Sequence, residues 1–238
     1  MMLPTDTIPP HPATFRSEHI ALFRDLLSSR DVKTILDPFA GIGTIHDLRP
    51  EYETWGIERE PEWANARPPY TLVGDALEAR KVLMRNGLPT TFDAAITSPV
   101  WGNRMSDHHE AKDDSIRNTY RHKLGRPITE GSSAILQWGP AYREFHLKAW
   151  TEMTAIVERF FILNIKDHVR KGEIQMVTQW HHQVFVDLGW MPRVDWKMLS
   201  PGQRFGENHE LRVEHEHVIL FEKMRDGNGQ QEEGRAHL

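Results

Sequence analysis

The sequence lacks cysteine, long apolar runs and an excess of basic charge. Without cysteine the chain cannot form disulfides or thiolate zinc sites, and it has no thiolate nucleophile of the kind that cytosine C5 methylation needs. The longest apolar runs, such as residues 160–165, are too short to span a bilayer, and residues 1–12 lack the basic and apolar regions of a signal peptide. We therefore expect a cytoplasmic protein without a membrane segment. The net charge of −5 requires that any nucleic-acid-binding surface be local.

The order of apolar patterns predicts one α/β domain over residues 1–223, followed by a disordered, glycine- and charge-rich tail at 224–238. Helical periodicity appears at 17–29, 140–158 and 173–188, and short apolar or alternating runs predict strands at 33–36, 54–57, 70–73, 92–97, 160–165, 194–199 and 213–221. This pattern is typical of a Rossmann-like, open seven-stranded, mostly parallel sheet with helices on both faces and an antiparallel C-terminal hairpin. The polar stretch 102–139 is predicted to be a loop or insertion over the active face.

A glycine-rich turn, DPFAGIGT at residues 37–44, follows the first predicted strand. Its two glycines let the backbone pass close to a ligand, although a purely structural turn is the alternative interpretation. No Gly-Lys-Ser/Thr follows, and His46 occupies the third glycine position of the dinucleotide fingerprint, so neither phosphate motif is present. Other predicted strands also end in polar residues, namely Glu58, Asp75, Ser98 and Lys166, which would line one crevice at the carboxyl edge of a parallel sheet.

The turn resembles motif I of the DNA amino-methyltransferases that use S-adenosylmethionine. The resemblance continues in order: it implies that Glu58 in GIERE binds the cofactor ribose, that Asp75 in VGDAL meets the adenine amino group beside Ala76, and that HPATFR at 11–16 packs on the methionine end. A carboxylate offers two acceptor oxygens to a vicinal diol, which suits the role of Glu58. The predicted cofactor-binding residues are Thr14, Phe15, Asp37, Pro38, Phe39, Gly41, Gly43, Thr44, Glu58, Arg59, Asp75 and Ala76.

The fourth strand ends in TSPVWGNR at 97–104, which resembles the catalytic motif S-P-P-Y or D/N-P-P-Y/F/W of the same family. The resemblance implies that Ser98 and the Pro99 carbonyl accept hydrogen bonds from the target amine while Trp101 stacks on a flipped base. Val100 stands where the second proline is usual, and Trp101 as a simple core residue is the alternative. Because serine at position 98 resembles the S-P-P-Y form of the motif, the resemblance implies N4 of cytosine as the target in preference to N6 of adenine. We take Ser98, Pro99, Val100 and Trp101 as the catalytic segment.

Asn103, Arg104, Arg117 and Arg121 are the predicted substrate-binding residues, because they follow the catalytic segment or supply local positive charge for phosphate contacts. An ordinary solvated loop is the alternative. The expected partner is double-stranded DNA with a flipped base, and the sequence is compatible with a homodimer. The 14 histidines, including the pairs 108–109 and 181–182, lack the spacing of a metal motif, so we expect surface or cross-strand histidines and no metal.

Two other functions remain open. The same cofactor could serve an RNA or small-molecule N-methyltransferase, which the acidic net charge permits. A non-catalytic binding protein on a decayed methyltransferase fold is the second alternative, and Val100 is the sequence feature that favours it. The full set of predicted cofactor residues argues against decay.

Overall fold

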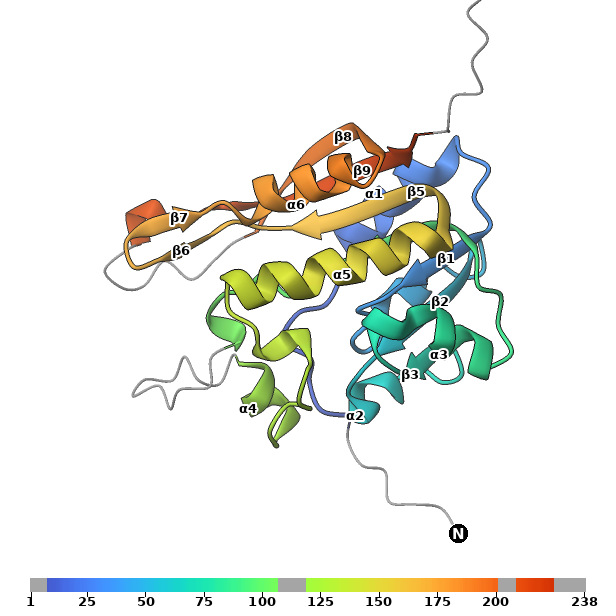
Figure 1. Cartoon of the computed structure of the whole chain (residues 1–238), viewed down its shortest axis with the longest axis horizontal. Coiled ribbons are helices and arrows are strands. Elements are labelled where there is room, and N and C mark those ends of the chain that lie inside the picture. The colour runs from blue at the N-terminus through green and yellow to red at the C-terminus, as the bar shows by residue number, and fades with distance from the viewer. Residues whose placement is uncertain (1–7, 107–118, 201–208, 225–238) are drawn as a thin grey trace, which may run out of the picture.

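A seven-stranded sheet forms the centre of the computed structural model, which describes residues 8–106, 119–200 and 209–224 (Figure 1). The strand order is β3-β2-β1-β4-β5-β9-β8. The strands are β1 Thr34–Asp37, β2 Glu53–Glu58, β3 Thr71–Val73, β4 Phe92–Thr97, β5 Val157–Ile165, β8 Trp190–Leu199 and β9 His215–Lys223. The first five are parallel to one another, whereas β9 runs antiparallel to both β5 and β8. The predicted fold class and all seven predicted strands are confirmed.

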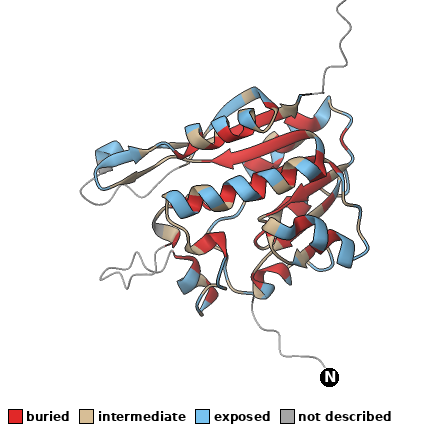
Figure 2. Ribbon diagram, in the orientation of Figure 1, coloured by how far each residue is buried: buried red, intermediate tan, exposed pale blue. Residues whose placement is uncertain are grey.

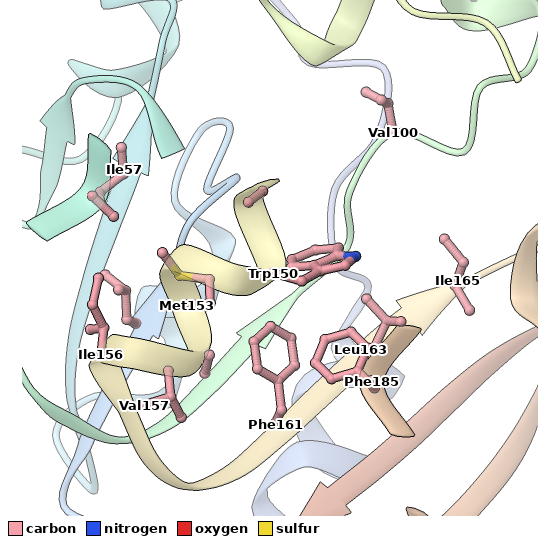
Figure 3. Packing of buried hydrophobic residues seen from close by; sticks show 14 of the residues in the cluster. Ile57, Val100, Trp150, Met153, Ile156, Val157, Phe161, Leu163, Ile165 and Phe185 are labelled. Atoms are coloured by element: carbon pink, nitrogen blue, oxygen red, sulfur yellow. The ribbon is translucent and has the colours of Figure 1, made fainter. Parts of the chain in front are cut away.

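Helices cover both faces of this sheet and divide the core in two. Helix α1, Ser17–Ser28, buries Phe23 and Leu27 against Ile96 and Ile162 on one face. On the other face lie α3 Ala79–Arg85, α5 Pro140–Ile156 and α6 Val177–Asp187, which pack in a larger, aromatic-rich core. Figure 2 shows the central strands buried, and Figure 3 shows Trp150 beside Phe161 and Phe185 in the larger core. Alternate side chains of β5 therefore enter different cores.

Only a short 3-10 helix, η1 Thr44–Leu48, connects the glycine turn to β2. His46 in this helix is buried, with Nδ1 2.8 Å from Thr54 Oγ1 and Nε2 2.9 Å from Thr71 Oγ1. Burial lowers the pKa of His46 to about 4, so the ring is neutral. A Cβ on Gly43, where φ is +76°, would lie 2.7 Å from the His46 ring. His46, which replaces the third glycine, thus packs against the glycine turn at Gly43.

The predicted helix at 173–188 is wrong at its beginning. Residues 168–175 form a hairpin of β6 His168–Arg170 and β7 Glu173–Gln175, and α6 begins only at Val177. The two turn residues, Lys171 and Gly172, both have positive φ, +53° and +76°, as a tight hairpin turn requires. This hairpin extends beyond the end of β5 (Figure 1). The lysine-glycine pair is the local signal that the periodicity argument missed.

Helical segments occur in the described part of the stretch predicted to be a loop or insertion. They are η3 Arg104–Ser106, α4 Tyr120–Leu124 and η5 Ser133–Ile135, and the short helix α2 Pro61–Ala64 lies near them. Thr119 caps α4 by accepting the His122 N–H, and Gly125 ends it at φ +79°. Residues 107–118 and most of the predicted tail, 225–238, lie outside the described residues, and the domain boundary at 223 stays a prediction. No helix in the described ranges is long and apolar enough to cross a membrane.

Candidate active site

Two adjoining cavities open at the carboxyl ends of the parallel strands, where ligands bind in sheets of this type. The larger has a volume of about 310 Å³ and the smaller about 50 Å³. His11, Phe39 and Ser98 line both. The His11 ring lies 4.4 Å from the Trp63 ring and 5.6 Å from the Tyr120 ring, and burial lowers its pKa to about 4. The neutral His11 ring therefore lies where the two cavities adjoin.

Glu58 lines the smaller cavity at the end of β2. Its Oε2 accepts the Gly41 N–H at 2.9 Å and its Oε1 accepts the Glu60 N–H at 2.9 Å. Gly41 has φ +54°, and a Cβ there would lie 3.1 Å from the His11 ring. Burial raises the pKa of Glu58 to about 7, against the lowering effect of these hydrogen bonds. The carboxylate is thus oriented by backbone N–H groups and keeps lone pairs that can accept ligand hydroxyls.

Asp37 joins the glycine turn to the catalytic segment. Its Oδ1 accepts Thr97 Oγ1–H at 2.6 Å and the Phe39 N–H at 3.0 Å. The residue is buried, which raises its pKa to about 7. Because Thr97 precedes Ser98 in the chain, this bond sets the spacing between the turn and the predicted catalytic serine.

Asp75 already has protein partners. Its Oδ1 accepts the Leu77 N–H at 2.9 Å, and its other oxygen forms an ion pair with Arg59. Arg59 also donates to the Glu130 carbonyl at 2.6 Å. The resemblance assigned Asp75 to the adenine amino group, and the structure adds that Arg59 links this carboxylate to a segment far along the chain.

Residues 119–136, here called the cover segment, close the smaller cavity. Tyr120, Ser132, Ser133 and Ala134 line it, and sequence analysis missed all four. Buried Glu60 holds this segment, because its carboxylate accepts Arg126 NH2 at 2.7 Å and both the Thr129 N–H and Oγ1–H at 2.9 Å. No sequence motif marks these contacts.

The catalytic segment 98–101 lies between the cavities. Ser98, Pro99 and Trp101 line the larger cavity, while the Val100 side chain turns away, lines the smaller cavity and packs in the core. Trp101 is half-buried, and its ring contacts core residues as well as the cavity. Gly102 ends the segment at φ +67°. Three of the four residues of the predicted catalytic segment thus face the larger cavity, and Val100 does not.

A polar floor, which sequence analysis also missed, extends the larger cavity from Ser98 across β5 and β9. Asn164 Nδ2 lies 3.5 Å from Ser98 Oγ and donates to Glu216 Oε2 at 3.1 Å. Arg16 and His19 from the start of α1 contact Glu216 Oε1 at 2.9 and 3.1 Å. Burial raises the pKa of Glu216, but these partners outweigh it and leave the pKa below its usual value. The floor therefore carries an ionised carboxylate.

Other predicted residues are placed as follows. Thr14, Phe15, Thr44 and Asn103 line the larger cavity, Pro38, Arg59 and Ala76 line the smaller, and the Phe15 N–H donates to Thr44 Oγ1 at 3.2 Å. Arg121 is exposed on α4 and lines neither cavity, and Arg117 lies outside the described residues. The structure describes the backbone of Arg104, which lies in η3, but not its side chain. Lys166, which was also predicted to line the crevice, lines neither cavity.

The expectation of surface or cross-strand histidines is wrong for four residues: His19, His46, His146 and His181 are buried. His215 and His217 on β9 lie side by side, with ring centroids 5.0 Å apart. The pair 108–109 lies outside the described residues. Over the described ranges, no three histidine or acidic side chains form a metal-binding group.

The sequence matches no protein-family model and no curated protein. The structure is similar to magnesium protoporphyrin IX methyltransferase (ChlM) from Synechocystis PCC 6803 with bound SAM, at a TM-score of 0.50 and 10% identity over 87% of this chain and 79% of that one. The chain has the class I methyltransferase fold. The YcgJ protein from Bacillus subtilis shares this fold at a TM-score of 0.51 and 11% identity, over 89% of this chain and 100% of that one.

Proposed function

We propose that the chain is an S-adenosylmethionine-dependent methyltransferase that acts on an exocyclic amino group of a base in double-stranded DNA, N4 of cytosine in preference to N6 of adenine. One observation carries this proposal: the larger cavity is lined both by the predicted cofactor residues Thr14, Phe15 and Thr44 and by the predicted catalytic residues Ser98, Pro99 and Trp101. Methyl donor and acceptor amine would therefore meet in one space.

The residues present fit the cofactor. Glu58 offers oriented acceptor oxygens for the ribose diol, and the segment around Thr14 and Phe15 lies against the glycine turn through the bond to Thr44. The volume of the larger cavity, about 310 Å³, is typical of small-ligand sites. When bound, the cofactor supplies an activated methyl group on its sulfonium. The smaller cavity, at about 50 Å³, is tight for the adenosine end, so we infer that Arg59 and the cover segment shift on binding.

The chemistry that these side chains support is orientation rather than strong base catalysis. An exocyclic amine delocalises its lone pair into the ring and is a poor nucleophile until acceptors draw it toward tetrahedral geometry. Ser98 Oγ and the Pro99 carbonyl would accept its two N–H groups, and Trp101 would stack on the base and offset part of the cost of unstacking it. Alignment and preorganised acceptors then supply the catalysis.

An RNA or small-molecule amine is the second candidate substrate. The observation that favours it is the net charge of −5 together with the position of Arg121 outside both cavities. A non-catalytic protein on this fold is the third candidate. The homodimer and the DNA partner stay proposals.

Transfer of a labelled methyl group from S-adenosylmethionine to unmethylated duplex DNA, followed by nucleoside analysis, tests the function. We expect N4-methylcytosine with wild-type protein and its loss in Ser98→Ala and Trp101→Ala. Trp196→Ala is the matched control, because Trp196 is an exposed tryptophan on β8 that lines neither cavity. Detection of N6-methyladenine would show that adenine is the target base. Labelled RNA or a labelled small amine, without labelled DNA, would show that the substrate is not DNA. Cofactor binding without any transfer would support the non-catalytic protein.

A further inference from the structure

A chain of buried hydrogen bonds ends on the catalytic segment. Trp150 Nε1 donates to His181 Nδ1 at 2.9 Å, His181 Nε2 lies 2.8 Å from Tyr142 Oη, and Tyr142 Oη lies 2.7 Å from the Val100 carbonyl oxygen. The three side chains are fully buried and come from α5 and α6. We call Trp150, His181 and Tyr142 the relay.

The direction of every bond in the relay is fixed by its ends. An indole N–H can only donate, so His181 Nδ1 must accept and the ring proton must lie on Nε2. His181 Nε2–H then donates to Tyr142 Oη. Because a carbonyl can only accept, the Tyr142 hydroxyl proton goes to Val100. Burial holds the pKa of His181 well below its usual value, so this single neutral tautomer persists at neutral pH.

A second contact holds Gly102, the residue that follows Trp101. The Gly102 carbonyl accepts the Trp138 N–H at 2.8 Å, and a Cβ on Gly102 would lie 2.5 Å from that nitrogen. Trp138 lies just before α5, the helix that carries Tyr142. Both residues that flank Trp101 are therefore anchored to the start of α5. Val100 has no ring to fix its φ angle, unlike a proline at the same place.

We propose that the relay residues Trp150, His181 and Tyr142 are positioning residues: they fix the peptide between Val100 and Trp101, which buries the Val100 side chain and directs the Trp101 ring into the larger cavity. The relay replaces by hydrogen bonding the rigidity that a second proline would give covalently. The expected effect on methyl transfer rests on the proposed function. The restraint that the relay places on the backbone at Val100 and Trp101 does not.

Two variants and one control test this inference. Tyr142→Phe removes the hydroxyl that touches Val100, and Trp150→Phe breaks the relay two bonds away without touching the catalytic segment. Trp190→Phe is the control, because Trp190 is equally buried in the same core and its Nε1 donates to Thr154 Oγ1 at 2.9 Å, away from the relay. The readouts are amide hydrogen exchange of residues 100–103 in the full chain, then kcat and KM for S-adenosylmethionine.

We expect faster exchange at residues 100–103 in both relay variants, with kcat lower by up to about 100-fold and KM for the cofactor little changed, as for a misplaced reacting group. The control should change global stability alone. Exchange at 100–103 that matches the control, or loosened exchange with kcat equal to that of the control, would overturn the inference. If the wild-type protein methylates no DNA but the relay variants still exchange faster at residues 100–103, the DNA proposal is rejected and the restraint on the segment is supported.

Discussion

At the scale of single residues, two buried carboxyl groups make the site sensitive to pH. Burial raises the pKa of Asp37 and Glu58 to about 7, above the values that the groups have in an unfolded chain. The folded state therefore favours the protonated forms. The stability that the folded state gains from protonated Asp37 and Glu58 is fully present below the pKa of these groups in the unfolded chain. It is lost as the pH rises through about 7.

Cofactor binding should depend on pH in the opposite sense, because ribose hydroxyls need the ionised form of Glu58 as acceptor. We expect the affinity for S-adenosylhomocysteine to weaken about tenfold per pH unit below 7 and to level off above it. Calorimetric titration at several pH values measures this slope. Glu58→Gln should bind more weakly and lose this part of the slope, and an unchanged slope would remove Glu58 from the ribose site.

Gly102 should be intolerant of a side chain for two separable reasons. Its φ of +67° costs an L-residue about 1–2 kcal/mol, and its Cβ would lie 2.5 Å from Trp138 N. Gly87 is a matched control, since it has φ +69° with nothing within 4 Å of its Cβ position. Thermal or denaturant unfolding should show Gly102→Ala to be more destabilising than Gly87→Ala, with methyl transfer lost only in the former. Equal effects would mean that the segment moves freely away from Trp138.

The sequence allowed some of these residues to be predicted, and the reason is physical. Asp37 and Glu58 are the last residues of their strands and Ser98 directly follows one, so strand order alone brings them to one edge of the sheet. Asn164 and Glu216 join the same edge only through the pairing of β5 with β9, whose register no local pattern reveals.

At the scale of elements, the cover segment depends on one buried carboxylate. Glu60→Ala should destabilise the segment by about 2 kcal/mol, because it removes charge-assisted bonds to Thr129 and Arg126. Arg126→Ala should cost less than about 1 kcal/mol, because the Arg126 side chain is 36% exposed and screened by solvent.

Limited proteolysis within 119–136 and the dissociation constant for the cofactor measure this effect. Faster cleavage and weaker binding are expected together in Glu60→Ala, because the cover segment lines the smaller cavity. Tight binding despite rapid cleavage would show that the cover segment is not part of the cofactor site.

Long periodic elements were predicted, and the errors concern short elements outside the seven-stranded sheet. The seventeen-residue helix α5 and the nine-residue strand β5 lie close to their predicted ranges. The hairpin β6–β7 has three residues in each strand, too few for alternation to outweigh the helical pattern that follows it. The helix α4, with five residues, likewise depends on its cap residues rather than on periodicity.

At the scale of the whole molecule, the net charge of −5 limits electrostatic binding to DNA. If phosphate contacts come from the six basic residues of 102–139, which include Arg117 and Arg121, the plot of log affinity against log salt should have a slope no steeper than about −5. Fluorescence anisotropy with a DNA duplex measures it. Charge reversal of Arg117 and Arg121 should flatten the slope, whereas Lys81→Glu, at an exposed residue of α3, should not. A steep slope that survives both reversals would place the DNA surface elsewhere.

The position of β9 between β5 and β8 also has a consequence for biosynthesis. As the chain leaves the ribosome, β5 is complete long before its partner β9 has been translated, and β8 emerges with no neighbour in the sheet at all. The apolar strand β5, which is buried on both faces in the finished protein, then presents an unpaired edge to other nascent chains. A chain released before residue 215 should therefore aggregate, and a chaperone that shields β5 should raise the yield of full-length protein.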